Sequence, residues 1–72
     1  MIYFTKYSEQ KFEILNKYQV FFRKEEICDA VLNPDKISKK GKYLSARKDG
    51  IKVVYDKKAG VIRVITFYPI KI

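Results

Sequence analysis

β-Branched and aromatic residues are frequent in the last third of the chain, and cations recur there at alternate positions. Three β-prone segments fall within residues 43–56 and 60–69, and turn residues separate them. The pair Asp49-Gly50 stands between the first two segments. It favours a two-residue type I′ turn, because both central residues of that turn need a positive φ. The pattern predicts a β-hairpin followed by a further strand.

The Asp49-Gly50 turn sets the expected register of this hairpin. Residues at equal distances from the turn face each other, so Arg47 faces Lys52 and Ser45 faces Val54. Side chains alternate between the two faces of a strand, which places Arg47 and Lys52 on one face. The other face is apolar and is expected to carry the core; it holds Leu44, Ala46, Ile51, Val53 and Tyr55.

The next turn is predicted over Lys57–Gly60. It places Val54 opposite Arg63, so that Arg63 joins Arg47 and Lys52 on one cationic face. Like charges directly opposite each other destabilise a sheet, so this face calls either for strong solvation or for an anion. On this register the apolar face gains Ile62, Val64, Thr66 and Tyr68.

The first part of the chain is predicted to form one strand and two helices. Ile2–Thr5 has the composition of a short strand. Apolar spacings of three and four then predict a helix over roughly Tyr7–Tyr18, with Ser8 as its N-cap. A second helix is expected over Lys24–Asn33, because two carboxylates lie in its first turn and apolar residues recur four apart. Pro34 ends this helix.

A basic segment leads from the second helix into the hairpin, and it is predicted to be a flexible connection with the residues Lys36, Lys39, Lys40, Gly41 and Lys42. The run is a candidate for guiding a phosphate backbone toward Arg47 and Arg63, and an ordinary solvated loop is the alternative for any single lysine here. The element order is then β-α-α-β-β-β, an α+β fold with the helices packed on one face of a small antiparallel sheet. The chain of 72 residues shows no linker or repeat, which indicates a single domain over residues 1–72.

The charge balance favours a polyanionic partner. Sixteen Lys and Arg against eight Asp and Glu give a net charge of +8, and the isoelectric point is near 9.7. RNA, DNA or an acidic protein would suit this charge, and a lysine-rich solvated surface is the alternative. No apolar run is long enough to span a membrane, and no signal-peptide pattern is present. The single Cys28 suits a cytoplasmic location, and no ligand cluster predicts a metal or another cofactor.

Several sequence segments resemble those of a known family. The segments Phe4–Tyr7, Lys24–Pro34, Val53–Asp56 and Arg63–Pro69 look like domain-of-unknown-function family 4258, which is grouped by fold with the RelE/ParE-like toxins of type II toxin–antitoxin systems. The chain has Tyr7 where that family commonly has a histidine. The resemblance implies a RelE-like domain and a toxin-like role, with RNA or ribosome-bound mRNA as the target and an acidic antitoxin as a partner.

Cleavage of RNA by its own 2′-hydroxyl needs a base, an acid and cations that hold the charge on the phosphate oxygens. The cationic face and the resemblance together predict these catalytic residues of a metal-independent endoribonuclease of the mRNA-interferase type: Arg47, Lys52, Arg63 and Tyr43. Further RNA contacts are expected from Lys6, Lys11, Lys39, Lys40, Lys42 and Tyr68. For the tyrosines, a place in the core is the alternative. The rival function is a noncatalytic binding module of the same fold, either for nucleic acid or for protein.

Three apolar residues share the predicted face of Arg63, namely Val61, Ile65 and Phe67. Apolar side chains on an open sheet face suggest a docking surface, here for an antitoxin segment or for a second copy in a homodimer. The alternative is that the C-terminal residues 70–72 cover them.

Overall fold

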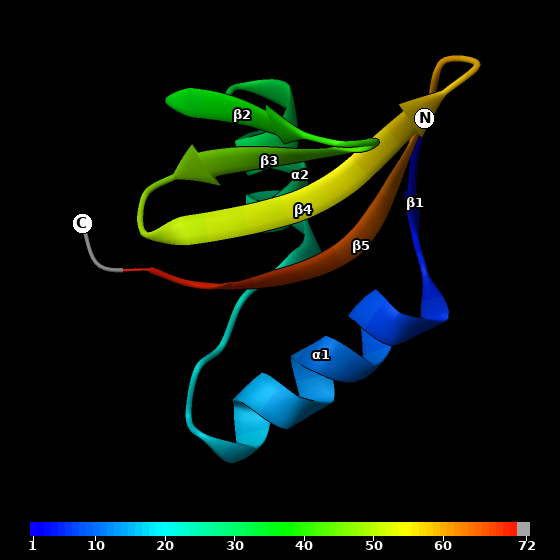
Figure 1. Cartoon of the computed structure of the whole chain (residues 1–72). Helices are drawn as coiled ribbons and strands as arrows, with labels where there is room; N and C mark the ends of the chain where they lie inside the picture. The colour runs from blue at the N-terminus through cyan, green and yellow to red at the C-terminus, as the bar shows by residue number, and fades with distance from the viewer. Residues whose placement is uncertain (71–72) are drawn as a thin grey trace.

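The computed structural model describes residues 1–70, which form two helices and a five-stranded sheet (Figure 1). In chain order the elements are β1 (Ile2–Phe4), α1 (Lys6–Lys17), α2 (Lys24–Leu32), β2 (Lys36–Lys40), β3 (Tyr43–Lys48), β4 (Ile51–Lys58) and β5 (Val61–Pro69). The predicted α+β fold is confirmed, with both helices on one face of the sheet. No helix in residues 1–70 is long and apolar enough to cross a membrane.

Helix α1 begins one residue earlier than predicted, and its N-cap is Thr5 rather than Ser8. The Thr5 hydroxyl accepts a hydrogen bond from the backbone N–H of Ser8 (3.2 Å) and donates one to the carbonyl of Val64 (2.8 Å). Ser8 lies buried inside the first turn, where its hydroxyl donates to the Thr5 carbonyl (2.8 Å). One side chain therefore both starts α1 and ties it to β5.

Helix α2 follows the prediction closely. The backbone N–H of Arg23 donates to the Glu26 carboxylate (3.0 Å), which satisfies one donor at the start of the helix. The inner side of α2 buries Ile27, Ala30 and Val31 against the sheet. The ammonium of Lys48 on β3 lies 2.8 Å from the Asp29 carboxylate, and this ion pair joins α2 to the sheet.

The sheet contains one strand more than expected and is mixed rather than antiparallel. Its order is β1-β5-β4-β3-β2, with β1 parallel to β5 and all other pairs antiparallel. The predicted basic connection is in fact strand β2, which pairs with β3 along its whole length through a two-residue turn at Gly41-Lys42. All five residues of β2 are exposed, so burial leaves no periodic signal there. Three lysines in such a segment are typical of a protected sheet edge.

The register of the first predicted hairpin is confirmed, and that of the second is wrong. Asp49 and Gly50 both have positive φ (50° and 81°), and Arg47 pairs with Lys52. The turn between β4 and β5, however, is only two residues long, Ala59-Gly60. A bulge then inserts Ile65 as an extra residue, because Tyr55 pairs with Val64 while Val54 pairs with Thr66.

The bulge reverses which side chains of β5 face the helices. Val64, before the bulge, and Phe67, after it, are both fully buried. Thr66 and Tyr68, predicted for the core, instead lie on the opposite face, since they pair with Val54 and Lys52. The core is formed by Leu15, Ile27, Ala30, Val31, Ala46, Ile51, Val53, Tyr55, Val64 and Phe67. Phe12 of α1 packs on Phe67, with 4.5 Å between the ring centroids.

Candidate nucleic-acid interface

The face of the sheet turned away from the two helices is not covered by any other element in residues 1–70 (Figure 1). We call it the open face. Strand alternation and pairing place on it Tyr3, Lys36, Ser38, Lys40, Tyr43, Ser45, Arg47, Lys52, Val54, Asp56, Lys58, Val61, Arg63, Thr66 and Tyr68. Its charged residues are strongly biased toward cations, because Asp56 is the one acidic residue of this set.

Residues paired across the strands arrange this face in three rows. The cationic row runs through Lys36, Arg47, Lys52 and Tyr68. The middle row runs through Ser38, Ser45, Val54 and Thr66. The tyrosine row, in which the β3–β4 register is continued by one pair, runs through Lys40, Tyr43, Asp56, Arg63 and Tyr3. Rows lie about 7 Å apart, because each is two residues further along the strands.

The cationic row brings three like charges onto adjacent strands. Lys36 pairs with Arg47, and Arg47 pairs with Lys52. None of the three forms a salt bridge among residues 1–70, whereas Lys24, Lys48 and Arg63 each do. Strands are about 4.8 Å apart, so the row places three cations within about 10 Å. Such neighbours repel one another unless an anion lies over them.

Tyr68 closes the cationic row at β5. The ammonium of Lys52 lies 5.7 Å from the centroid of the Tyr68 ring, within the range of a cation–π interaction. This contact holds the Lys52 side chain beside an aromatic surface. Tyr68 is thus placed with the predicted RNA contacts and not in the core.

Arg63 lies on the open face, as predicted, but it is not a free cation. Its guanidinium donates to both oxygens of Asp56, at 3.0 Å from Nε and 2.5 Å from Nη2. These hydrogen bonds lower the pKa of the Asp56 carboxyl and raise the pKa of Arg63. The predicted register placed Asp56 away from Arg63, and the shorter turn brings the two residues opposite each other. Of the predicted catalytic cations, only Arg47 and Lys52 remain without an acidic partner in residues 1–70.

Two tyrosines accompany this ion pair in the tyrosine row. Tyr3 on β1 is 55% exposed and pairs with Arg63, and Tyr43 on β3 is 37% exposed. The electrostatic influence of both phenols raises the pKa of Arg63, after the larger effects of Asp56. The ammonium of Lys42 lies 5.3 Å from the centroid of the Tyr43 ring. Aromatic rings and cations are therefore interleaved along this row, as on surfaces that bind single-stranded nucleic acid.

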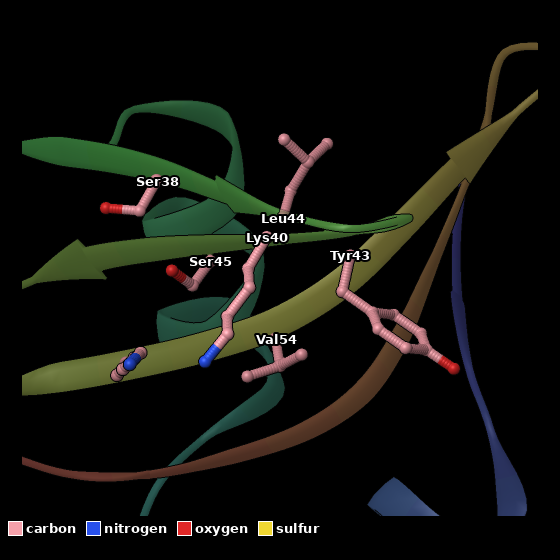
Figure 2. Close-up of a pocket in the computed structure, with 7 residues that line it drawn as sticks. Ser38, Lys40, Tyr43, Leu44, Ser45 and Val54 are labelled. Carbon is pink, nitrogen blue, oxygen red and sulfur yellow. The ribbon is translucent and has the colours of Figure 1, made fainter.

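A shallow depression of about 460 Å³ lies between the tyrosine row and the cationic row. It exists because the middle row has short side chains, while its neighbours on both sides have long ones. The depression is lined by Ser38, Lys40, Tyr43, Leu44, Ser45, Lys52 and Val54. In Figure 2 the Lys40 side chain reaches from β2 across the sheet toward β4, and Leu44 points to the opposite side.

The other predicted RNA contacts do not all reach the open face. Lys6 lies on α1 and Lys11 within the same helix, in the layer on the far side of the sheet. Lys39 alternates with Lys40 on β2 and pairs with Leu44, so its side chain faces the helix side. Lys40 lies in the depression, and Lys42 lies in the turn beside it. The predicted cationic loop is thus divided between two faces.

The predicted docking trio is separated by the same bulge. Phe67 is fully buried in the core, so it cannot contact a partner. Val61 remains on the open face at the far end of β5, and Ile65 is the bulged residue between the two registers. The predicted C-terminal cover extends into Lys71 and Ile72, which lie outside the described residues.

Sequence reasoning missed Ser38 and Ser45 as site residues, and it included Lys36 only as a member of the basic run. The run 36–42 has no apolar alternation, and only the pairing with β3 shows which of its side chains share a face. Residues 1–70 contain no group of three or more His, Cys, Asp or Glu side chains that could hold a metal ion. Comparisons with protein-family models, curated proteins and solved structures find no match for this chain.

Proposed function

We propose that the open face binds RNA and that the protein acts in the cytoplasm as the toxin-like component of a type II toxin–antitoxin system. The observation that carries the proposal is the cationic row, in which Lys36, Arg47 and Lys52 lie side by side without acidic partners in residues 1–70. A phosphate backbone laid along the row would replace mutual repulsion by attraction and would release bound counterions. The resemblance of segments such as Val53–Asp56 and Arg63–Pro69 to the toxin-like family supports the same role.

Salt dependence tests the binding part of this proposal. Five cations of the open face have no acidic partner in residues 1–70, namely Lys36, Lys40, Arg47, Lys52 and Lys58. They give an expected slope of about −3.5 for log Kobs against log salt with single-stranded RNA. Lys52→Ala should lower this slope by about 0.7 in magnitude and weaken binding. Lys57→Ala is the matched control, because Lys57 lies on the same strand but alternates to the helix side. Equal losses in both variants would show that the open face is not the binding surface.

Endoribonuclease activity is the sharper form of the proposal. Arg47 and Lys52 are adjacent and can hold two oxygens of one phosphate, and Tyr43 lies on the same face as a proton donor or a base-stacking ring. Purified protein should be incubated with mixed-sequence RNA and with translating ribosomes, and the cut ends mapped. Discrete cuts that disappear in Arg47→Ala, while the variant keeps its fold, support catalysis on this face.

The Arg63–Asp56 pair favours the second candidate, a noncatalytic binding module of the same fold. The Nε and Nη2 of Arg63 already donate to the Asp56 carboxylate, which balances the positive charge of the guanidinium, so this arginine attracts a phosphate less strongly than a free one would. Intact RNA in both assays, together with salt-dependent binding, would establish this second function. An acidic antitoxin is the protein partner that matches the charge of the open face, and a homodimer is the alternative partner.

A further inference from the structure

The shallow depression contains hydroxyl and apolar side chains, which are not needed to bind the phosphate backbone of RNA through charge. Its floor consists of Ser38, Ser45 and Val54, which pair directly across β2, β3 and β4. Two hydroxyls and one small apolar side chain form a surface that is flat, partly apolar and able both to donate and to accept hydrogen bonds. Figure 2 shows the side chains of Ser38, Ser45 and Val54 on one side of the sheet.

Cations stand on two sides of this floor. Lys40 belongs to the tyrosine row and Lys52 to the cationic row, and both line the depression. The two rows are four residues apart along a strand, or about 13 Å. This distance is long enough for one nucleotide to lie over the floor, with the phosphate on one side of it directed toward Lys40 and the phosphate on the other side directed toward Lys52.

We infer that the depression over Ser38, Ser45 and Val54 holds one unstacked nucleobase of a single-stranded RNA, read by the two serine hydroxyls and flanked by phosphates on Lys40 and Lys52. The inference rests on the RNA binding proposed above and adds a source of base preference to it. The Tyr43 ring, 37% exposed at the end of the depression, supplies an aromatic wall for the base.

The size of the depression agrees with this occupant. About 460 Å³ is within the range of small-ligand sites and exceeds what a phosphate alone would need. Its lining mixes apolar area from Val54 with hydroxyls and ammonium groups, which is the combination that a base with a phosphate on each side would contact. In Figure 2 no strand or helix is drawn over the floor of the depression, and the Lys40 side chain that reaches across it would move aside to admit a base.

The test compares binding of labelled homopolymers of U, C and A, each about eight nucleotides long, by fluorescence anisotropy. For the unaltered protein we expect the best and the worst homopolymer to differ by about tenfold, since two hydroxyl hydrogen bonds contribute about 0.7 kcal/mol each to that factor. The double variant Ser38→Ala/Ser45→Ala should reduce the difference to about twofold with an unchanged salt slope.

Thr66→Ala is the matched control, because Thr66 carries a hydroxyl in the same middle row but does not line the depression. It should keep the preference of the unaltered protein. A second variant, Ser45→Leu, keeps a strand-compatible side chain but fills the floor, and it should weaken the preferred homopolymer most.

Three outcomes overturn the inference. If all homopolymers bind equally well with a steep salt slope, the depression reads no base, while the proposed function stands. If the serine double variant keeps the full preference, another part of the chain carries it. If no homopolymer binds at low salt, the proposed function fails together with the base site.

Discussion

The two faces of the sheet are built from the same strands but from different chemistry. The covered face carries Val53, Val64 and Phe67, all fully buried beneath α1 and α2. The open face carries lysines, arginines, tyrosines and serines, with Asp56 as its acidic residue. Neighbours in the sequence, such as Phe67 and Tyr68 or Lys39 and Lys40, therefore serve different purposes. Stability is concentrated on one face, and the capacity to bind an anion on the other.

The largest expected effect is a difference in stability between the variants Phe67→Ala and Tyr68→Ala. Phe67→Ala removes a fully buried ring that contacts Phe12, and it should cost about 3–5 kcal/mol of unfolding free energy. A chain of 72 residues has a total of roughly 4–10 kcal/mol, so this variant should lose about a third or more of its unfolding free energy. Tyr68→Ala should cost less than about 1.5 kcal/mol, because the ring lies on the open face. Urea titration followed by circular dichroism measures both.

Tyr68→Ala, the less destabilising of these two variants, is the one expected to act directly on RNA binding. Tyr68→Ala removes the aromatic neighbour of Lys52 and should weaken RNA binding while the protein stays folded. If Tyr68→Ala proved as destabilising as Phe67→Ala, then the bulge at Ile65 would be misplaced, and the division between the two faces would fail with it.

The second prediction sets Lys40 against Lys39. Both lysines are exposed on β2, so charge and strand composition are matched. Lys40→Ala should weaken binding of single-stranded RNA by about fivefold and lower the salt slope by about 0.7, because Lys40 lies on the open face. Lys39→Ala should leave both quantities within experimental error. Similar losses in the two variants would indicate that net charge, and not the open face, controls binding.

The contrast between the two hairpins shows what the sequence could predict. Asp49-Gly50 has a strong turn preference, and residues 44–47 and 51–53 beside it alternate between apolar and polar, so register and faces there were predicted correctly. In β5 the segment Val64–Phe67 consists of β-prone residues and contains no glycine that would mark the bulge. One inserted residue moves every later side chain to the other face. For this reason the prediction placed Phe67 on the open face and Tyr68 in the core, the reverse of what the structure has.

The site was predicted in part, for related reasons. Arg47 and Lys52 follow directly from the Asp49-Gly50 hairpin. The partner of Arg63 depends on the length of the next turn, and Ala59-Gly60 gives little warning of a two-residue turn. Strand β2 is defined by its pairing with β3 rather than by its own residues, so Ser38 could not be assigned to any face beforehand.

The third prediction concerns the one acidic residue of the open face. Asp56→Asn keeps the size of the side chain but releases the Arg63 guanidinium, which adds a free cation to the tyrosine row. RNA affinity should rise by about threefold, and the salt slope should increase in magnitude by about 0.7. Thr66→Ala, on the same face, serves as the uncharged control. Unchanged affinity in Asp56→Asn would show that RNA does not reach the tyrosine row.

The same variant changes the response to acid. Hydrogen bonds from Arg63 lower the pKa of Asp56 below its ordinary value of 3.8 in the folded state. The stability that this pair adds is therefore present above that value and is lost as the pH falls through the lower folded pKa. As the pH falls, the Tm of Asp56→Asn should decrease less than the Tm of the unaltered protein. Part of the decrease that remains comes from Asp29, because its hydrogen bond with Lys48 lowers the pKa of that carboxyl.

The smallest expected effect lies in the turn that positions β5 against β4. Ala59 has φ of +52°, a left-handed conformation that costs a residue with a Cβ about 1 kcal/mol, and Gly60 follows it at +78°. Ala59→Asn creates an Asn-Gly pair, the preferred sequence for this turn type, and should stabilise the fold by about 0.5–1 kcal/mol, or roughly 4 °C in Tm. Ala59→Val should destabilise it. Because the turn lies at the opposite end of β4 from the cationic row, RNA affinity should remain unchanged in both variants. A change in affinity without a change in Tm would mean that the turn itself contacts RNA.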